Sequence, residues 1–273
     1  MSLLLVGTVF FSACNKDSND KDIPLIPLLS TMSSFDKDGV LDEMTSYQYD
    51  KDRRLTKMTS NNGSYVLLEY SASTVTEKDY KDEKLDYAAV ATLNNKGLCT
   101  SASVDDEYYL STNDYDINDY LKTSTSESAS RIQNEWRTIS DGNYVTISSE
   151  NNPKTTKSAT LREFDLLSQS RPLKLFIRKF MSKTNLKSTA DNNEKREYQF
   201  YTNKTNTIEA ENCGVSFNGK QNKNPIKQVT FTYFQSGQPI TETTTYTYEY
   251  DTKDRITKQV ADDGNYTVYT YTN

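Results

Sequence analysis

A long internal repeat constrains the fold of this chain more than any other feature of its sequence. Residues 47–71 align with residues 248–272 without a gap, at an offset of 201 positions and with 9 identities in 25 positions. In the first copy the identical positions are Tyr47, Tyr49, Asp50, Arg54, Thr56, Lys57, Gly63, Tyr65 and Tyr70. Two segments so alike in length and pattern are expected to fold alike.

Each copy predicts three antiparallel strands joined by two turns. Alternating Tyr-x-Tyr indicates a strand with one aromatic face. The carboxylates of Asp50 and Asp251 can accept a hydrogen bond from the backbone two residues further on and close a turn. Asn-Gly before the third strand of one copy, ending at Gly63, and Asp-Gly ending at Gly264 are typical of a type I′ hairpin turn. The repeat unit is therefore a meander, with Arg54 and Arg255 opening its second strand.

Weaker copies extend the pattern along the chain. Asp36 leads to Leu41, and Asp116 leads to Leu121, at the spacing that joins Asp50 to Leu55, and residues 93–98 form a shorter relative. Units of this kind stack on their neighbours to bury a continuous face. The 20 tyrosines admit two interpretations: cross-strand pairs that cover a core, or exposed rows that bind sugar rings.

The sequence as a whole predicts an all-β fold, a curved antiparallel meander sheet or an open, partial barrel. Residues 229–234 and 243–250 alternate well and support this prediction. One segment differs, because Pro172 begins a run with apolar residues at helical spacing, which predicts a short amphipathic helix over about 172–183. This helix covers the sheet in one interpretation and contacts anionic lipid or a partner in the other.

The N-terminus predicts export and lipid attachment. Residues 1–13 form an apolar run too short to span a bilayer, and Ser12 and Ala13 precede Cys14. This segment resembles the signal peptide and lipobox of Gram-negative bacterial lipoproteins, which implies acylation of Cys14 and a membrane partner. A frayed apolar terminus is the other interpretation. Residues 14–30 then form a polar, disordered tether, and 31–273 a single β-rich domain.

Composition excludes several classes of chemistry. There is no histidine, which removes Ser-His-Asp and Cys-His catalysis and histidine metal sites. The formal net charge of −6 argues against nucleic-acid binding, and no cofactor is predicted. Cys99 and Cys213 are a candidate disulfide in an oxidising compartment, with two buried thiols as the alternative.

One acidic segment has the spacing of a calcium loop. Asp114, Asp116 and Asn118 follow the pattern D-x-D-x-N, but Asp119 and Thr125 stand where an EF-hand needs glycine and glutamate. These residues are weak metal candidates, and a solvated turn explains them as well.

The repeat units resemble a known class. The pattern Tyr-Asp-x-x-x-Arg-Leu/Ile-Thr-Lys is similar to the YD (RHS-type) repeats of secreted bacterial proteins. Together with the lipobox, it resembles a family of bacterial lipoproteins of unknown function with a porin-like, LolA-like antiparallel sheet, best over 31–80 and 225–273. The resemblance implies a fold and an outer-membrane location, on the periplasmic or the surface face. It implies no catalytic residues.

Three functions remain open at this level. The first is a non-enzymatic binding or carrier module for an apolar or glycan ligand on the concave face. The second is a structural or accessory component of an envelope protein assembly. The third is a hydrolase that uses two carboxylates, which the absence of histidine does not forbid.

Overall fold

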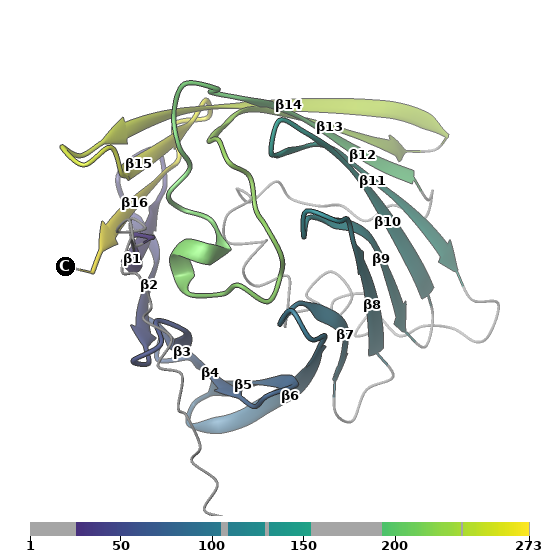
Figure 1. The fold of residues 1–273 in the computed structure, drawn as a ribbon. Helices are drawn as coiled ribbons and strands as arrows, with labels where there is room; N and C mark the ends of the chain where they lie inside the picture. The colour runs from purple at the N-terminus through teal and green to yellow at the C-terminus, as the bar shows by residue number, and fades with distance from the viewer. Residues whose placement is uncertain (1–25, 105–108, 129–130, 154–192, 236, 273) are drawn as a thin grey trace, which may run out of the picture.

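Sixteen antiparallel strands close into one barrel in the computed structural model (Figure 1). The structure describes residues 26–104, 109–128, 131–153, 193–235 and 237–272. The strands are β1 Leu29–Phe35, β2 Leu41–Tyr49, β3 Leu55–Ser60, β4 Tyr65–Tyr70, β5 Thr74–Lys81, β6 Lys84–Leu93, β7 Cys99–Val104, β8 Tyr109–Tyr115, β9 Leu121–Ser128, β10 Arg131–Ser140, β11 Asn143–Pro153, β12 Asn193–Phe200, β13 Ile226–Gln235, β14 Gln238–Tyr250, β15 Ile256–Ala261 and β16 Tyr266–Tyr271. Each strand pairs with the next along the chain, so the whole barrel is one up-and-down meander.

The closure of the sheet corrects the prediction of an open sheet or partial barrel. β1 pairs with β2 on one side and with β16 on the other. At this seam the hydroxyls of Thr31 and Thr270 lie 2.7 Å apart. Closure removes both free edges and satisfies their backbone groups. Strand alternation predicts which strands are neighbours, but it does not say whether the first and last strands meet.

Helix is nearly absent from the described part of the chain. Its one helical element is the single 3-10 turn η1, Ala210–Cys213. The helix predicted over about 172–183, and Cys14 with the signal peptide, lie outside the described residues. No helix within the described ranges is long and apolar enough to cross a membrane.

The two long repeats fold as predicted into matching three-strand units, β2–β3–β4 and β14–β15–β16. The second turn in each unit differs from the prediction of type I′. Only the glycine has a positive φ there, +86° at Gly63 and +89° at Gly264. The connection is therefore longer, with glycine in the left-handed position after an ordinary turn.

The Asp turn occurs five times in one form. In each copy the Asp or Asn side-chain oxygen accepts from the backbone N–H groups two and four residues on, at 2.8–3.0 Å; the residues are Asp36, Asp50, Asn94, Asp116 and Asp251. A register shift precedes every copy. The guanidinium groups of Arg54 and Arg255 pair with the second carboxylate oxygen at 2.7–2.8 Å. The hydrogen bond from the Arg255 backbone amide, helped by its side chain, lowers the pKa of Asp251.

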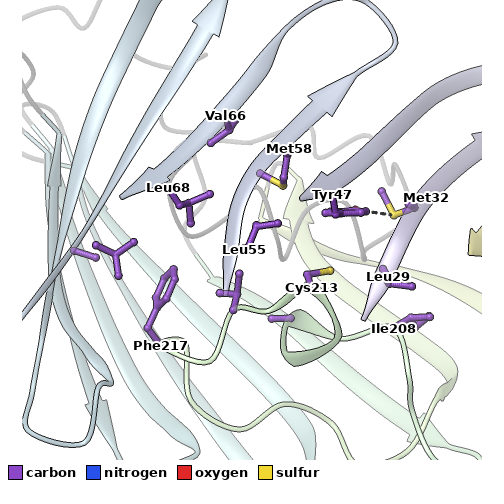
Figure 2. Packing of buried hydrophobic residues seen from close by; sticks show 14 of the residues in the cluster. Leu29, Met32, Tyr47, Leu55, Met58, Val66, Leu68, Ile208, Cys213 and Phe217 are labelled. Atoms are coloured by element: carbon purple, nitrogen blue, oxygen red, sulfur yellow. Dashed lines mark hydrogen bonds between the residues drawn. The ribbon is translucent and has the colours of Figure 1, made fainter. Parts of the chain in front are cut away.

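The connection from β12 to β13, residues 201–225, folds into the interior of the barrel, and we call it the plug (Figure 1). Its apolar side chains pack with the inner faces of β1–β7, β15 and β16 into one core cluster. Figure 2 shows Ile208, Cys213 and Phe217 of the plug among wall residues that include Leu55 and Leu68. The main core of this barrel is therefore the contact between plug and wall.

Candidate functional site

The plug is held at one rim of the barrel, which carries four of the five Asp or Asn turns. Because consecutive strands alternate in direction, the turns after β2, β6, β8 and β14 lie at the same end. This end also receives the plug, which follows β12. We call it the plug rim. The turn at Asp36, after β1, lies at the opposite rim.

Turns at the plug rim present backbone N–H groups to the interior. The first residue after the turn donates its N–H to the plug at Leu55 (Gly214 carbonyl, 3.1 Å), at Cys99 (Phe217 carbonyl, 2.8 Å) and at Ile256 (Thr207 hydroxyl, 2.9 Å). A register shift takes a residue out of the regular ladder and leaves its backbone group free for another partner. The repeated turn thus gives the plug its docking points.

Two tyrosines of the repeat form hydrogen bonds with the backbone beside these docking points. The hydroxyls of Tyr70 and Tyr271 donate to the carbonyls of Leu55 and Ile256 at 2.9 and 2.7 Å. Burial raises the pKa of both tyrosines, to about 12 for Tyr271, so both hydroxyls remain donors. Arg54 stacks over Tyr70 at 4.6 Å, and Arg255 stacks over its equivalent at 4.5 Å. The predicted repeat residues build the wall and seat the plug.

The opposite rim shows the same turn away from residues 201–225. Leu41 follows the Asp36 turn at the position that Leu55 occupies after Asp50. Leu55 is fully buried, whereas Leu41 is 42% exposed. The turn therefore does not bury the residue that follows it; the plug does.

Glycine is required where the plug backbone runs against a turn. Gly214 has a φ of +69°, and a Cβ there would lie 2.6 Å from the Arg53 carbonyl and 2.8 Å from the Leu55 nitrogen. Gly219 has a φ of +77°, and its Cβ would lie 2.5 Å from the Asp119 carbonyl. Both contacts are with backbone atoms, which cannot move aside without deforming the turn.

We expect Gly214→Ala to destabilise the protein more than Gly97→Ala. Both glycines have positive φ, so both substitutions carry the left-handed strain of about 1–2 kcal/mol. A Cβ at Gly97 meets nothing within 4 Å, whereas at Gly214 it clashes and adds about 1–3 kcal/mol. Urea unfolding of the two variants measures the difference. Equal losses of unfolding free energy would show that the plug does not press on the Asp50 turn.

The plug also carries a buried carboxyl group. Glu209 accepts from the side-chain amides of Asn206 and Asn222 at 2.7 and 3.3 Å. Burial raises the pKa of Glu209 to about 7, although these two hydrogen bonds act to lower it. We therefore expect the stability of the plug to depend on pH in the neutral range.

The inner wall away from the apolar cluster is polar and charged. Alternation along β10–β12 places one set of side chains inside the barrel. This set includes Ile147, which lies between Arg137 and Arg196. We call its polar members and Tyr198 the polar sector: Arg131, Gln133, Glu135, Arg137, Ser149, Asn151, Glu194, Arg196 and Tyr198. Arg137 bonds Glu135 at 2.6 Å, and Arg196 lies 3.9 Å from Glu194.

Several polar atoms of this sector are buried without a hydrogen-bond partner. They are Arg131 Nε, Arg137 Nη1, Asn151 Oδ1 and the Tyr198 hydroxyl. The side chain of Arg137 is only 7% exposed, and Asn151 and Tyr198 are 7% and 8% exposed. Buried polar groups are normally paired, and each unpaired one costs about 1–3 kcal/mol. This concentration of unsatisfied groups on three adjacent strands marks the sector as a candidate binding site.

Sequence reasoning missed the polar sector, although a signal for it exists. In β10, the polar residues Arg131, Gln133, Glu135 and Arg137 recur at every second position. This period places all four on one face of a strand. The opposite face carries Trp136, which is 46% exposed.

The other residues singled out in the sequence have separate places. Asp116 accepts the turn hydrogen bonds from the backbone of Asn118 and Tyr120. In the described ranges, no group of three or more potential ligands among histidine, cysteine, aspartate and glutamate is arranged to hold a metal ion. Cys99 and Cys213 are buried free thiols in the core cluster.

The outer wall of the barrel is largely polar. Its strands alternate an inward side chain with an outward one, as in β14, where Thr243, Thr245, Thr247 and Glu249 alternate with the inward Tyr246 and Tyr248. Outward positions on other strands include Thr76, Lys78, Ser101, Ser103, Thr123, Thr125, Lys195, Glu197, Thr230, Thr232 and Lys258. Thr and charged residues thus face outward, while the apolar side of most strands faces inward.

Comparison with known proteins supports the barrel fold. No protein-family model matches the chain, and neither does any curated protein. A porin-like protein from Bacteroides uniformis is similar in structure, with a TM-score of 0.56 and 15% sequence identity over 89% of this chain and 98% of that one. A TcdB2–TccC3–Cdc42 complex also matches, with a TM-score of 0.32 and 10% identity over 89% of this chain and 13% of that one. At these identities, the first likeness shows an antiparallel β-barrel fold and nothing about activity.

Proposed function

We propose that the protein is an envelope lipoprotein whose barrel is a non-enzymatic binding module, with a glycan bound on the polar sector. One observation carries the proposal: Arg137, Asn151 and Tyr198 bury polar atoms that have no partner. A hydroxyl-rich ligand supplies both donors and acceptors, and it would satisfy such a mixed set.

The distribution of side chains favours a glycan over an apolar ligand. The apolar part of the inner wall is already buried against the plug, through residues such as Leu55, Leu68 and Phe217. Aromatic rings border the polar sector on β13, where the ring centroids of Phe231 and Tyr233 lie 5.3 Å apart and Arg196 lies over Phe231. Aromatic faces next to hydrogen-bonding groups suit sugar rings.

Membrane attachment in this proposal comes from a lipid on Cys14 and not from the strands. A bilayer-spanning barrel has an apolar outer band and a polar interior. The outer wall here carries threonine and charged residues such as Lys195 and Glu197, which pair with each other at 2.8 Å. Charged residues facing lipid cost about 2–4 kcal/mol each at the bilayer midplane. An anchored barrel beside the membrane avoids this cost.

Replacing Cys14 with alanine is expected to release the protein from membranes. The acyl chains on this cysteine would be its main hold on the bilayer, because lipid anchoring scales with buried CH₂ groups at about 0.8 kcal/mol each. Fractionation of envelopes from cells that express either form measures the effect. Retention of the Cys14→Ala protein in the membrane fraction would refute lipid anchoring.

The binding proposal makes an unusual prediction for Tyr198→Phe. The hydroxyl of Tyr198 is buried and unpaired, so its removal should leave stability unchanged or raise it by about 1 kcal/mol. The same change should weaken retention of a bound glycan at least about tenfold, since one hydrogen bond to the ligand is lost. Native mass spectrometry of protein isolated from its own envelope measures glycan retention, and urea unfolding measures stability.

Tyr70→Phe is the matched control. Its hydroxyl is bonded to the Leu55 carbonyl, far from the polar sector, so the substitution should cost about 1 kcal/mol of stability and leave glycan retention unchanged. A preparation that carries a stoichiometric protein in place of a glycan would favour the assembly role and overturn the binding proposal.

A further inference from the structure

The polar sector carries more positive than negative charge. Among its members, Arg131, Arg137 and Arg196 face two carboxylates, Glu135 and Glu194. All five groups lie on the inner wall of two strands, β10 and β12, which flank β11. The sector as a whole therefore has a formal charge of about +1, in a protein whose net charge is −6.

The two carboxylates leave the arginines incompletely paired. The carboxylate of Glu135 pairs with Nη2 of Arg137 at 2.6 Å. The carboxylate of Glu194 lies 3.9 Å from Nη2 of Arg196, which is a long distance for an ion pair. In the described part of the chain, Arg131 lies within ion-pair distance of no carboxylate. Burial lowers the pKa of Arg131, against the raising influence of Glu194. A buried guanidinium in such surroundings gains from a further anion.

Unused donor atoms show where that anion fits. Arg137 Nη1 is buried with no partner although Nη2 is bonded, and Arg131 Nε is unpartnered in the same way. The Tyr198 hydroxyl is a third unpartnered atom. Burial raises the pKa of this tyrosine to about 12, although Arg196 and Arg137 act to lower it, so the hydroxyl keeps its proton and can donate. These guanidinium nitrogens and this phenol lie on the same inner face of the sheet, and all of them are donors that an oxyanion can accept from.

The aromatic neighbours indicate what carries the anion. Arg196 stacks over Phe231 at 5.3 Å, and Tyr198 stacks with Phe200 at 6.4 Å between ring centroids. Phe231 and Tyr198 are each 8% exposed, so these rings form an apolar backing beside the arginines. Aromatic and cationic groups side by side suit a ligand that has a sugar ring and a charged substituent. The planar fork of a guanidinium matches a carboxylate better than a spherical anion.

From these observations, we infer that the polar sector recognises a carboxylate on an acidic saccharide, with Arg137 and Tyr198 as its donors and Arg131 as a second cationic contact. This inference rests on the proposed function and names the ligand class for the same site. It assigns Arg137 a binding role in addition to its ion pair with Glu135.

The test compares trigalacturonate with its methyl ester, which has the same sugar skeleton without charge. Isothermal titration calorimetry on the full mature chain should show at least about tenfold tighter binding of the acid, and the preference should shrink as salt is raised. Arg137→Gln should remove the preference. Arg137→Lys keeps the positive charge but loses the planar guanidinium, so this variant should keep only part of the preference for the acid.

Two further variants serve as controls, one for folding and one for charge. Glu135→Gln with Arg137→Gln removes both partners of the buried pair, so folding does not suffer from a lone carboxylate. Lys195→Gln removes a cation from the outward face of β12 and should leave the preference intact.

Equal binding of acid and ester, binding of neither, or tighter binding of a sulfated trisaccharide would overturn the carboxylate inference. The proposed function is judged separately, by whether protein from the native envelope retains a glycan. A retained neutral glycan would refute the inference and leave the proposed function standing.

Discussion

Leu55→Ala is expected to lower the free energy of unfolding by about 2–5 kcal/mol, whereas Leu41→Ala should lower it by less than about 1 kcal/mol. The two leucines occupy the same position after the same turn. Leu55 is fully buried between wall and plug, and Leu41 is 42% exposed at the opposite rim. The difference therefore measures what the plug contributes at one docking point.

Urea unfolding monitored by circular dichroism gives both values, and the matched residue type removes differences in side-chain chemistry. Ile256→Ala should behave like Leu55→Ala, because Ile256 is also fully buried and donates its N–H to Thr207. Similar losses for Leu55→Ala and Leu41→Ala would mean that the plug does not pack at the rim as described.

Stability is expected to fall as pH rises from about 5 to about 8. Burial raises the pKa of Glu77 to about 8 and that of Glu209 to about 7, well above the ordinary value for a glutamate carboxyl. Between the unfolded and folded pKa values the folded protein binds more protons, so raising the pH favours unfolding. Each carboxyl contributes a slope approaching about 1.4 kcal/mol per pH unit, and around pH 6 the two together approach about 2.7.

Glu77→Gln separates the two contributions. Glu77 is 6% exposed, and the Tyr87 hydroxyl donates to it at 2.7 Å, a bond that a glutamine oxygen can also accept. The variant should lose about half of the slope and gain stability at pH 8. Glu69→Gln, which changes an exposed carboxylate paired with Lys78, should leave the slope unchanged. A wild-type curve that is flat from pH 5 to pH 8 would contradict the burial of these carboxyls.

Local pattern predicted the repeat unit and its turns well. Tyr-x-Tyr alternation and the spacing from Asp50 to Arg54 depend only on neighbouring residues, and both copies fold as such patterns require. The exception is the turn that contains Gly63, for which Asn-Gly predicts type I′. The connection has one residue more than that turn allows, which sequence spacing alone does not reveal.

The local sequence pattern does not predict the long-range features of this fold. Closure depends on β1 meeting β16, more than 230 residues apart in the sequence. The plug has no period, so residues 201–225 carry no signal that they enter the barrel. The polar sector can be predicted only if one knows which face of each strand lies inside the barrel. Without that knowledge, alternating charged residues such as Arg131 and Arg137 indicate a face exposed to solvent.

The central claim is that turns at one rim seat the plug through the backbone N–H groups of Leu55, Cys99 and Ile256. Amide hydrogen exchange of the intact protein tests it most directly. We predict that these three amides exchange slowly and share one free energy of opening after correction for their intrinsic rates, because a single opening of the plug exposes all of them. Fast exchange of the three amides, or opening free energies that differ as in independent surface turns, would contradict this claim.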